Sequence, residues 1–168
     1  MFLDRDGVIN VDRGYVASRA DFKWIPGAIQ AIKALNDAGY YVFVATNQSG
    51  IARGLYTERE MQELHDYISR KLAEKAARID DWRYCPFHPE GTIAALARTS
   101  DWRKPEPGMI LDLLQAWPID RSRSVLIGDK ESDMQAARAA DVRGLRFDGG
   151  NLLAFVRAHV LGPRPRPS

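Results

Sequence analysis

Short apolar stretches alternate with longer amphipathic stretches along the chain. The apolar stretches of strand type cover residues 1–3, 40–46, 81–85, 124–128 and 143–147. Their alternation with helical patterns predicts successive βαβ units. Residues 40–46 and 124–128 are apolar throughout, which is typical of central parallel strands covered on both faces. The expected fold is therefore α/β, with a doubly wound, mainly parallel sheet of five or six strands and helices on both faces.

Local signals mark the helices between these strands. Pro26 stands near the start of the first helical stretch and Gly39 follows its end, while Thr57 and Glu60 have the spacing of a capping box. The expected helices lie within residues 25–39, 57–77, 107–117, 131–140 and 151–160.

The length and composition favour one compact domain. A chain of 168 residues with 45% hydrophobic content can bury a full core, which we expect to span residues 1–160. Residues 161–168 are rich in proline and arginine and are expected to form a disordered tail. With one cysteine there is no internal disulfide, and neither a membrane span nor a leader segment is evident. We expect a cytoplasmic monomer.

The charge balance bears on possible partners. Lys and Arg total 24 against 22 Asp and Glu, so the chain has no broad basic field. Such a field is what duplex nucleic acid or an anionic membrane attracts. Neither is therefore an expected partner, and a small molecule is the better candidate.

Polar residues stand where the predicted strands end. Asp4 follows the first strand, Thr46 closes the second, Asp129 comes just after the fourth, and Lys104 precedes a helix. In a doubly wound sheet, ligands bind beyond the carboxyl ends of the strands, where the strand order reverses. We therefore expect these four groups to meet at one edge of the sheet.

The pair Asp4 and Asp6 raises an electrostatic question. Residues two apart leave a strand end on the same side, and two carboxylates held there repel one another unless a cation offsets them. Asp129 adds a third carboxylate, and a set of oxygen ligands of this kind suits Mg²⁺. Taken alone, the pair could also simply end the strand and cap a turn.

Four motifs in a fixed order carry a family resemblance. They are Asp4-x-Asp6, Thr46-Asn47, Lys104 before a helix, and Gly128-Asp129-x-x-x-Asp133. Together they resemble the haloacid dehalogenase-like (HAD-like) phosphotransferases over about residues 1–150. Each has a plain structural alternative, since Thr46 could be an ordinary strand residue, Lys104 a surface lysine and Asp133 a first-turn acid.

The resemblance implies a role for each acid. Asp4 would be the nucleophile that forms an aspartyl-phosphate. Asp6 would be the general acid, protonated when substrate binds, and its backbone carbonyl would ligate Mg²⁺ beside the carboxylates of Asp4 and Asp129. Asp133 would orient a metal-bound water. The second carboxylate thus has a separate task, and the cation makes its closeness to the first tolerable.

The resemblance also implies the groups that hold phosphate. Lys104 would offset the charge of the nucleophile and of the phosphoryl group. The Thr46 hydroxyl and the Asn47 backbone amide would bind phosphate oxygens.

Short loops narrow the resemblance, because the chain has no room for a large cap domain. DRGYV (12–16), TNQSGIARG (46–54), YCPFHPEG (84–91) and RKPEPGM (103–109) resemble the D,D-heptose 1,7-bisphosphate phosphatases, with histidinol-phosphate phosphatases next. Arg103 would bind the second phosphate through its guanidinium fork. By this resemblance the substrate contacts would be Asp12, Arg13, Gly14, Tyr15, Asn47, Gln48, Ser49, Arg103 and Lys130, with Arg53 a weaker candidate.

One departure from the family concerns zinc. Those relatives bind a structural zinc through a Cys-x-His and a later Cys-x-Cys, and here the positions read Cys85, Phe87, Ser100 and Trp102. His88 stands one position late, so four ligands cannot be assembled. We expect no structural zinc, with Phe87 and Trp102 holding the loop by packing.

The resulting hypothesis is a magnesium-dependent phosphatase that removes the 7-phosphate of D-glycero-D-manno-heptose 1,7-bisphosphate, a precursor of bacterial lipopolysaccharide. Histidinol phosphate and polynucleotide 3′-phosphate ends are alternative substrates. A silent sugar-phosphate-binding module is the alternative from another class, against which the presence of both Asp4 and Asp6 argues. The preferred anomer is left open.

Overall fold

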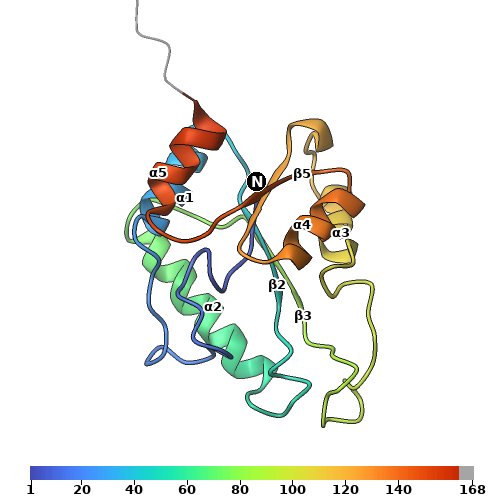
Figure 1. Cartoon of the computed structure of the whole chain (residues 1–168). Coiled ribbons are helices and arrows are strands. Elements are labelled where there is room, and N and C mark those ends of the chain that lie inside the picture. Colours follow the sequence, from blue (N-terminus) through green and yellow to red (C-terminus); the bar gives the residue numbers. More distant parts are fainter. Residues whose placement is uncertain (163–168) are drawn as a thin grey trace, which may run out of the picture.

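The computed structural model describes residues 1–162, and a single parallel sheet forms its centre (Figure 1). The strand order is β3-β2-β1-β4-β5. The α/β fold with a parallel sheet, expected from the alternating pattern, is therefore confirmed. The strands are β1 (Phe2–Leu3), β2 (Phe43–Asn47), β3 (Asp81–Cys85), β4 (Val125–Gly128) and β5 (Arg143–Arg146).

Helices cover both faces of the sheet. In Figure 1, α1, α2 and α5 lie on one side and α3 and α4 on the other, which confirms the doubly wound arrangement. The helices are α1 (Ala28–Asp37), α2 (Glu58–Ala73), α3 (Gly108–Ala116), α4 (Glu131–Ala139) and α5 (Leu152–Val156). A 3₁₀ turn, η1 (Arg121–Arg123), precedes β4, and a π-helical turn, η2 (Arg157–Leu161), continues α5.

Alternate residues of the central strands divide the core in two. Leu3 of β1 belongs to the larger core, under α1, α2 and α5, whereas Phe2 belongs to the smaller core, under α3 and α4. Phe2 is paired in register with Phe43 of β2 and Leu126 of β4, which point into the same smaller core. Because of this period of two, the two residues of β1 give one buried side chain to each core.

Several predicted boundaries move by a few residues. The second strand begins at Phe43, because Tyr40 still belongs to the turn that follows α1 and donates its amide to Leu35. The Thr57–Glu60 capping box is present, but α2 ends at Ala73, and Ala76 just beyond has a positive φ. The expected tail falls largely on residues 163–168, which lie outside the described part of the chain. The single domain of residues 1–160 stays a prediction.

The strand order places a crevice at one edge of the sheet. From β1 the chain moves outward through β2 to β3, and it then returns to the other side of β1 to form β4 and β5. Ligands bind at such a reversal, beyond the carboxyl ends of the strands. The segments that follow β1 and β4 carry Asp4 and Asp129 to this point. Within residues 1–162, no helix combines the length and apolar character that a membrane crossing needs.

Candidate active site

A cavity of about 570 Å³ lies at this edge. The residues that line it do not include four of the predicted site residues, namely Arg13, Thr46, Arg53 and Asp129. Tyr56, Pro105 and Ser132 line it and had not been predicted. The predicted residues that line it are Asp4, Asp6, Asp12, Gly14, Tyr15, Asn47, Gln48, Ser49, Arg103, Lys104, Lys130 and Asp133.

The ammonium group of Lys104 joins three separate elements in the floor of the cavity. Its Nζ lies 3.1 Å from Asp4 Oδ1 and 2.6 Å from Asp133 Oδ1, and it donates to the Ala45 carbonyl at 2.8 Å. Lys104 and both carboxylates are buried. The backbone amide of Asp4 donates to the Ile127 carbonyl at 3.0 Å, which extends the pairing of β1 with β4 by one residue. The predicted nucleophile is thus fixed through both its backbone and its side chain.

The acids outnumber the cation that they share. Burial raises the pKa of Asp4 to about 7, since the lowering by Lys104 is opposed by Asp133 and Asp6. Burial also raises the pKa of Asp129. Burial disfavours the charge on Lys104, but the attraction of Asp4 and Asp133 raises its pKa overall. A further cation would therefore stabilise the ionised acids.

The arrangement of these oxygens fits a divalent metal ion. One carboxylate oxygen from each of Asp4, Asp129 and Asp133 lies within 4.8 Å of the others. Asp129 Oδ1 is buried and accepts no hydrogen bond from the described residues. Asp133 also accepts from the Lys130 amide at 2.9 Å, so fewer of its lone pairs are free. Oxygen ligands alone, few in number, match Mg²⁺ better than zinc or calcium.

Two glycines allow the acidic segments to approach the backbone. Gly7 has φ +87°, and a Cβ placed on it would lie 2.3 Å from Asp129 Oδ2. A Cβ on Gly128 would lie 2.3 Å from the Cβ of Asp133. Any side chain at either position would push an acid of the cluster away.

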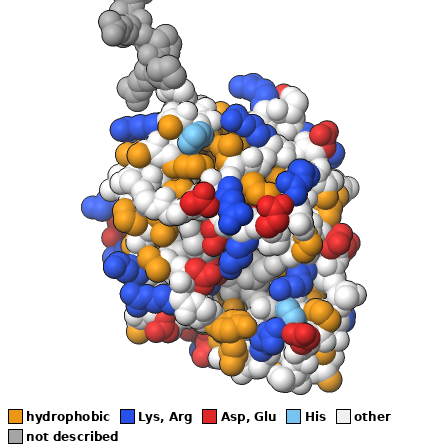
Figure 2. Space-filling view, in the orientation of Figure 1, with side chains coloured by type: hydrophobic (Ala, Val, Ile, Leu, Met, Phe, Trp, Pro, Cys, Tyr) orange, Lys and Arg blue, Asp and Glu red, His pale blue; other side chains and the backbone are white. Residues whose placement is uncertain are grey.

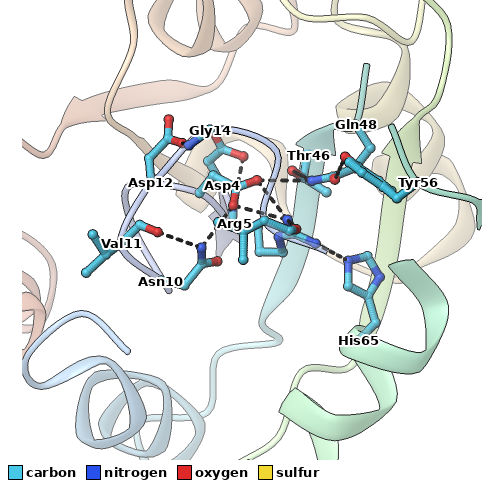
Figure 3. A network of polar contacts seen from close by, with 12 residues as sticks. Asp4, Arg5, Asn10, Val11, Asp12, Gly14, Thr46, Gln48, Tyr56 and His65 are labelled. Atoms are coloured by element: carbon cyan, nitrogen blue, oxygen red, sulfur yellow. Dashed lines mark hydrogen bonds and ion pairs between the residues drawn. The ribbon is translucent and has the colours of Figure 1, made fainter. Parts of the chain in front are cut away.

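Asp6 has a different set of partners, of which Arg5, Asn10 and Gln48 are labelled in Figure 3. Both of its carboxylate oxygens accept from Arg5 Nη2 at 3.1 Å, and one or the other also accepts from Asn10 at 2.9 Å and from Gln48 at 3.1 Å. Its side chain is not part of the three-carboxylate cluster. This is compatible with the predicted division of work, in which Asp6 contacts metal only through its carbonyl. The assignment of Asp6 as the acid stays a prediction.

The segment after β2 is fixed by side-chain amides. The Asn47 side chain donates to the Lys104 carbonyl at 2.9 Å and accepts from the Lys104 amide at 3.0 Å. Asn47 therefore positions the lysine segment, a task that the sequence did not indicate. Thr46 is buried and its Oγ1 accepts from Gln48 at 2.9 Å.

Charged loops surround the mouth of the cavity. Figure 2 shows basic and acidic side chains interspersed on the face of the molecule that it draws. Lys130 forms an ion pair with Asp12 at 2.9 Å, and Asp12 also accepts from the Gly14 amide at 2.9 Å. The half-buried Arg103 leaves Nη1 without a partner among the described residues. Arg53 instead contacts Glu90, at 3.3 Å. Of the three arginines among the predicted substrate contacts, Arg103 is the one that lines the cavity.

The loop after β3, for which we expect no structural zinc, contributes to a small apolar cluster. Cys85 and Met109 are buried there, with Phe87 and Trp102 packed against them. The guanidinium carbon of Arg98 lies 3.7 Å from the centre of the Phe87 ring. Packing by Phe87 and Trp102 is therefore confirmed, while the absence of zinc stays a prediction.

Sequence reasoning missed four residues around Asp6, namely Arg5, Asn10, Tyr56 and His65. Met61, Ile68 and Leu72 are all buried along α2, and His65 falls on that same face. Helical periodicity could have shown that this histidine is buried, but not that it contacts Arg5.

Comparison with known proteins gives concordant results. The family described as HAD-hydrolase-like matches residues 101–154. A D-glycero-beta-D-manno-heptose-1,7-bisphosphate 7-phosphatase from Rhodopseudomonas palustris is 51% identical over 156 residues, which cover 93% of this chain and 87% of that protein. The Escherichia coli K12 protein of the same name is 45% identical over 142 residues, or 84% and 74% of the two chains.

A solved structure extends the similarity to three dimensions. It is a D,D-heptose 1,7-bisphosphate phosphatase from B. bronchiseptica, complexed with magnesium and phosphate. The TM-score is 0.81 at 34% identity, with 99% of this chain and 88% of that chain covered.

The fold and the ordered acidic motifs define a HAD-like phosphatase, an enzyme that hydrolyses phosphoric monoesters. Sequence identity of 45–51% over most of this chain and of its curated relatives identifies the family within this class of enzymes. The chain belongs to the family of the D-glycero-beta-D-manno-heptose-1,7-bisphosphate 7-phosphatases. The resemblance seen in the motifs is therefore confirmed.

The close approach of Gly7 to Asp129 predicts the effect of one methyl group. Gly7→Ala should weaken Mg²⁺ binding by at least about tenfold, because the new Cβ would overlap the Asp129 carboxylate. Titration calorimetry with MgCl₂ measures this. The matched control is Gly149→Ala, since Gly149 has φ +96° but nothing within 4 Å of its Cβ position. Equal Mg²⁺ affinity in the two variants would contradict the steric explanation.

The burial of His65 predicts a pH-dependent stability. Burial, with the nearby Arg5 charge, lowers its pKa from 6.5 to about 3. At acidic pH the unfolded chain therefore binds a proton at His65 that the folded chain does not bind. The free energy of unfolding falls as the pH drops below the pKa of His65 in the unfolded chain. Between about pH 7 and about pH 5, wild type should lose about 2 kcal/mol more unfolding free energy than His65→Gln. Urea unfolding at both pH values measures this, and parallel losses would mean that His65 is not buried neutral.

Proposed function

We propose that this protein is a magnesium-dependent phosphatase that removes the 7-phosphate of D-glycero-D-manno-heptose 1,7-bisphosphate. The observation that carries the proposal is the 51% identity to a phosphatase named for this reaction, over most of both chains. Histidinol phosphate is the less favoured substrate, because the relatives reported above are all named for heptose bisphosphate. The curated relatives' names specify the β anomer, and we extend that preference to this chain.

In the first step, a carboxylate oxygen of Asp4 attacks phosphorus in line with the bond to the sugar. A phosphorus–oxygen bond forms at Asp4 and the bond to the sugar oxygen breaks, while Asp6 gives its proton to that oxygen. Lys104 holds the attacking carboxylate in place and offsets its charge. Magnesium, held by the acids of the floor, would further neutralise charge on the phosphoryl group when bound.

In the second step, a water molecule attacks the phosphorus of the aspartyl-phosphate. Its proton passes to Asp6, the bond from phosphorus to Asp4 breaks, and inorganic phosphate leaves. Both acids then have the protonation states with which they began. The proposed ligands of the ion are the carboxylates of Asp4 and Asp129 and the carbonyl of Asp6, with Asp133 beside them.

The second phosphate of the substrate needs its own partner. Asn47, which lines the cavity, and the buried Thr46 beside it would hold the reacting phosphate, and Arg103 would bind the other phosphate in the same cavity. A guanidinium fork suits a phosphate that does not react, because it can bind two oxygens at once. The other loop residues that line the cavity would contact the sugar.

Further expectations stay predictions. We expect the reaction to take place in the cytoplasm, as a step toward lipopolysaccharide heptose, and the enzyme to act as a monomer. Nucleic acid and membranes are not expected partners, and no structural zinc is expected.

The proposal predicts a substrate order. The kcat/KM for the β anomer of heptose 1,7-bisphosphate should exceed the values for histidinol phosphate and fructose 1,6-bisphosphate by at least about tenfold. Phosphate release measures these values, and identification of the product locates the phosphate removed. Asp4→Asn should abolish turnover of every substrate while the circular dichroism spectrum is kept. A best value for histidinol phosphate would defeat the heptose assignment.

The role of Arg103 predicts a selective loss. Arg103→Ala should lower kcat/KM for the bisphosphate by about 10- to 100-fold, since a charge-assisted hydrogen bond contributes about 1.5–3 kcal/mol. With heptose 7-phosphate, which lacks the second phosphate, the loss should be under about threefold. Arg53→Ala is the matched control, because Arg53 does not line the cavity. Equal losses on both substrates would show that Arg103 does not recognise the second phosphate.

A further inference from the structure

A buried polar network contacts the carboxylate of Asp6 through Arg5 and Gln48. Its outer members, His65 and Tyr56, have no task in the proposed mechanism (Figure 3). Arg5 stands between the two catalytic acids in the sequence and its side chain is fully buried. Its Nη2 donates to both carboxylate oxygens of Asp6 and to the Val16 carbonyl. Its Nη1 lies 3.2 Å from Nε2 of His65. One arm of the network therefore runs from α2 through Arg5 to Asp6.

The chemistry of the first arm fixes the state of His65. A guanidinium nitrogen can only donate, so Nε2 of His65 must accept and the proton of the neutral ring is on Nδ1. The ring stacks on Trp82 of β3, with centroids 4.2 Å apart and planes 20° apart. A buried, stacked ring has little freedom to turn. It therefore offers Arg5 an acceptor at a fixed place.

A second arm reaches Asp6 from the start of the same helix. Tyr56 precedes Thr57, the N-cap of α2, and its hydroxyl donates to Gln48 Oε1. That contact decides which way the Gln48 amide faces. Its Nε2 is left to donate to Asp6 at 3.1 Å and to Thr46 at 2.9 Å. When Asp6 is ionised, after it has given up its proton, a reversed amide would place an oxygen against the carboxylate instead.

Packing fixes the position of the Tyr56 ring, just as stacking fixes that of His65. Its ring lies against Gly50, so closely that a Cβ on that glycine would be 2.2 Å from the ring. Tyr56 is largely buried although it touches the cavity. Both arms therefore begin at a buried ring on or beside α2 and end on the carboxyl group of Asp6.

We propose that His65 and Tyr56 are positioning residues for proton transfer, which hold the Asp6 carboxyl group through Arg5 and Gln48 at the angle that the leaving oxygen requires. The inference rests on the proposed function, which makes Asp6 the proton donor. Neither residue exchanges a proton with substrate. Their effect comes from orientation, to which proton transfer is sensitive at the scale of an ångström.

The test compares two substrates that differ in their need for a proton. The aryl leaving group of p-nitrophenyl phosphate departs as a stable anion, whereas the sugar oxygen of heptose 1,7-bisphosphate must be protonated. The rate of the first phosphoryl transfer to Asp4 is measured for both by rapid quench. A misplaced acid slows the second substrate and spares the first, whereas general damage to the fold slows both.

The variants remove one contact each. His65→Phe keeps a ring on Trp82 but removes the acceptor, and Tyr56→Phe removes only a hydroxyl. Each should slow transfer from the heptose substrate by about 10- to 100-fold and transfer from p-nitrophenyl phosphate by less than about threefold. His65→Gln, which supplies another acceptor, should recover most of the loss. Tyr67→Phe is the matched control on α2, outside the network, and should match wild type on both substrates.

Asp6→Asn separates this inference from the proposed function. It should show the same selective loss, but larger. If it does while His65→Phe and Tyr56→Phe behave like wild type, or slow both substrates equally, the positioning role is wrong and the function stands. If Asp6→Asn itself slows both substrates equally, the assignment of the acid fails and this inference with it. Should His65→Phe not fold, Tyr56→Phe decides by the same ratio of rates.

Discussion

The ion pairs of Lys104 are the interaction on which the rest of the site depends. A single ammonium group binds a carboxylate after β1, a carboxylate in α4 and a carbonyl of β2, and the lysine itself comes from the segment before α3. Four parts of the chain thus meet at one buried atom. Breaking a buried pair of this kind by removing one partner typically costs about 3–5 kcal/mol, because the remaining charge is left uncompensated. Stability and chemical function are therefore coupled at this atom.

Much of the fold could be predicted from the sequence, because its physical causes are local. Apolar stretches define the strands, and the capping box at Thr57 defines the start of α2. The carboxyl ends of parallel strands must share one edge, so the meeting of Asp4 with Asp129 followed from the positions of these residues at strand ends. Boundaries were harder, since Tyr40 has strand character but is taken up by the turn after α1.

The contacts around Asp6 could not be predicted, because they depend on packing between distant segments. Nothing in the sequence near Arg5 indicates that its guanidinium would meet a histidine sixty positions later. The hydrogen bond from Tyr56 decides the orientation of the Gln48 side-chain amide, and a sequence pattern does not encode such an orientation. The loop from Cys85 to Trp102 could be predicted in part. The sequence showed that zinc ligands are missing there, and packing of Phe87 and Trp102 was the expected means of holding the loop.

The two residues of β1 help to fix the register of this strand in the sheet. Because side chains alternate along a strand, a slip of β1 by one position would exchange Phe2 with Leu3 between the two cores. The same slip would place Arg5, instead of Asp4, at the floor of the cavity. The mismatch of an aromatic ring and a leucine in the wrong cores disfavours that misfolded arrangement. The placement of Phe2 and Leu3 in separate cores thus decides that a carboxylate, and not a guanidinium, lies in the active site.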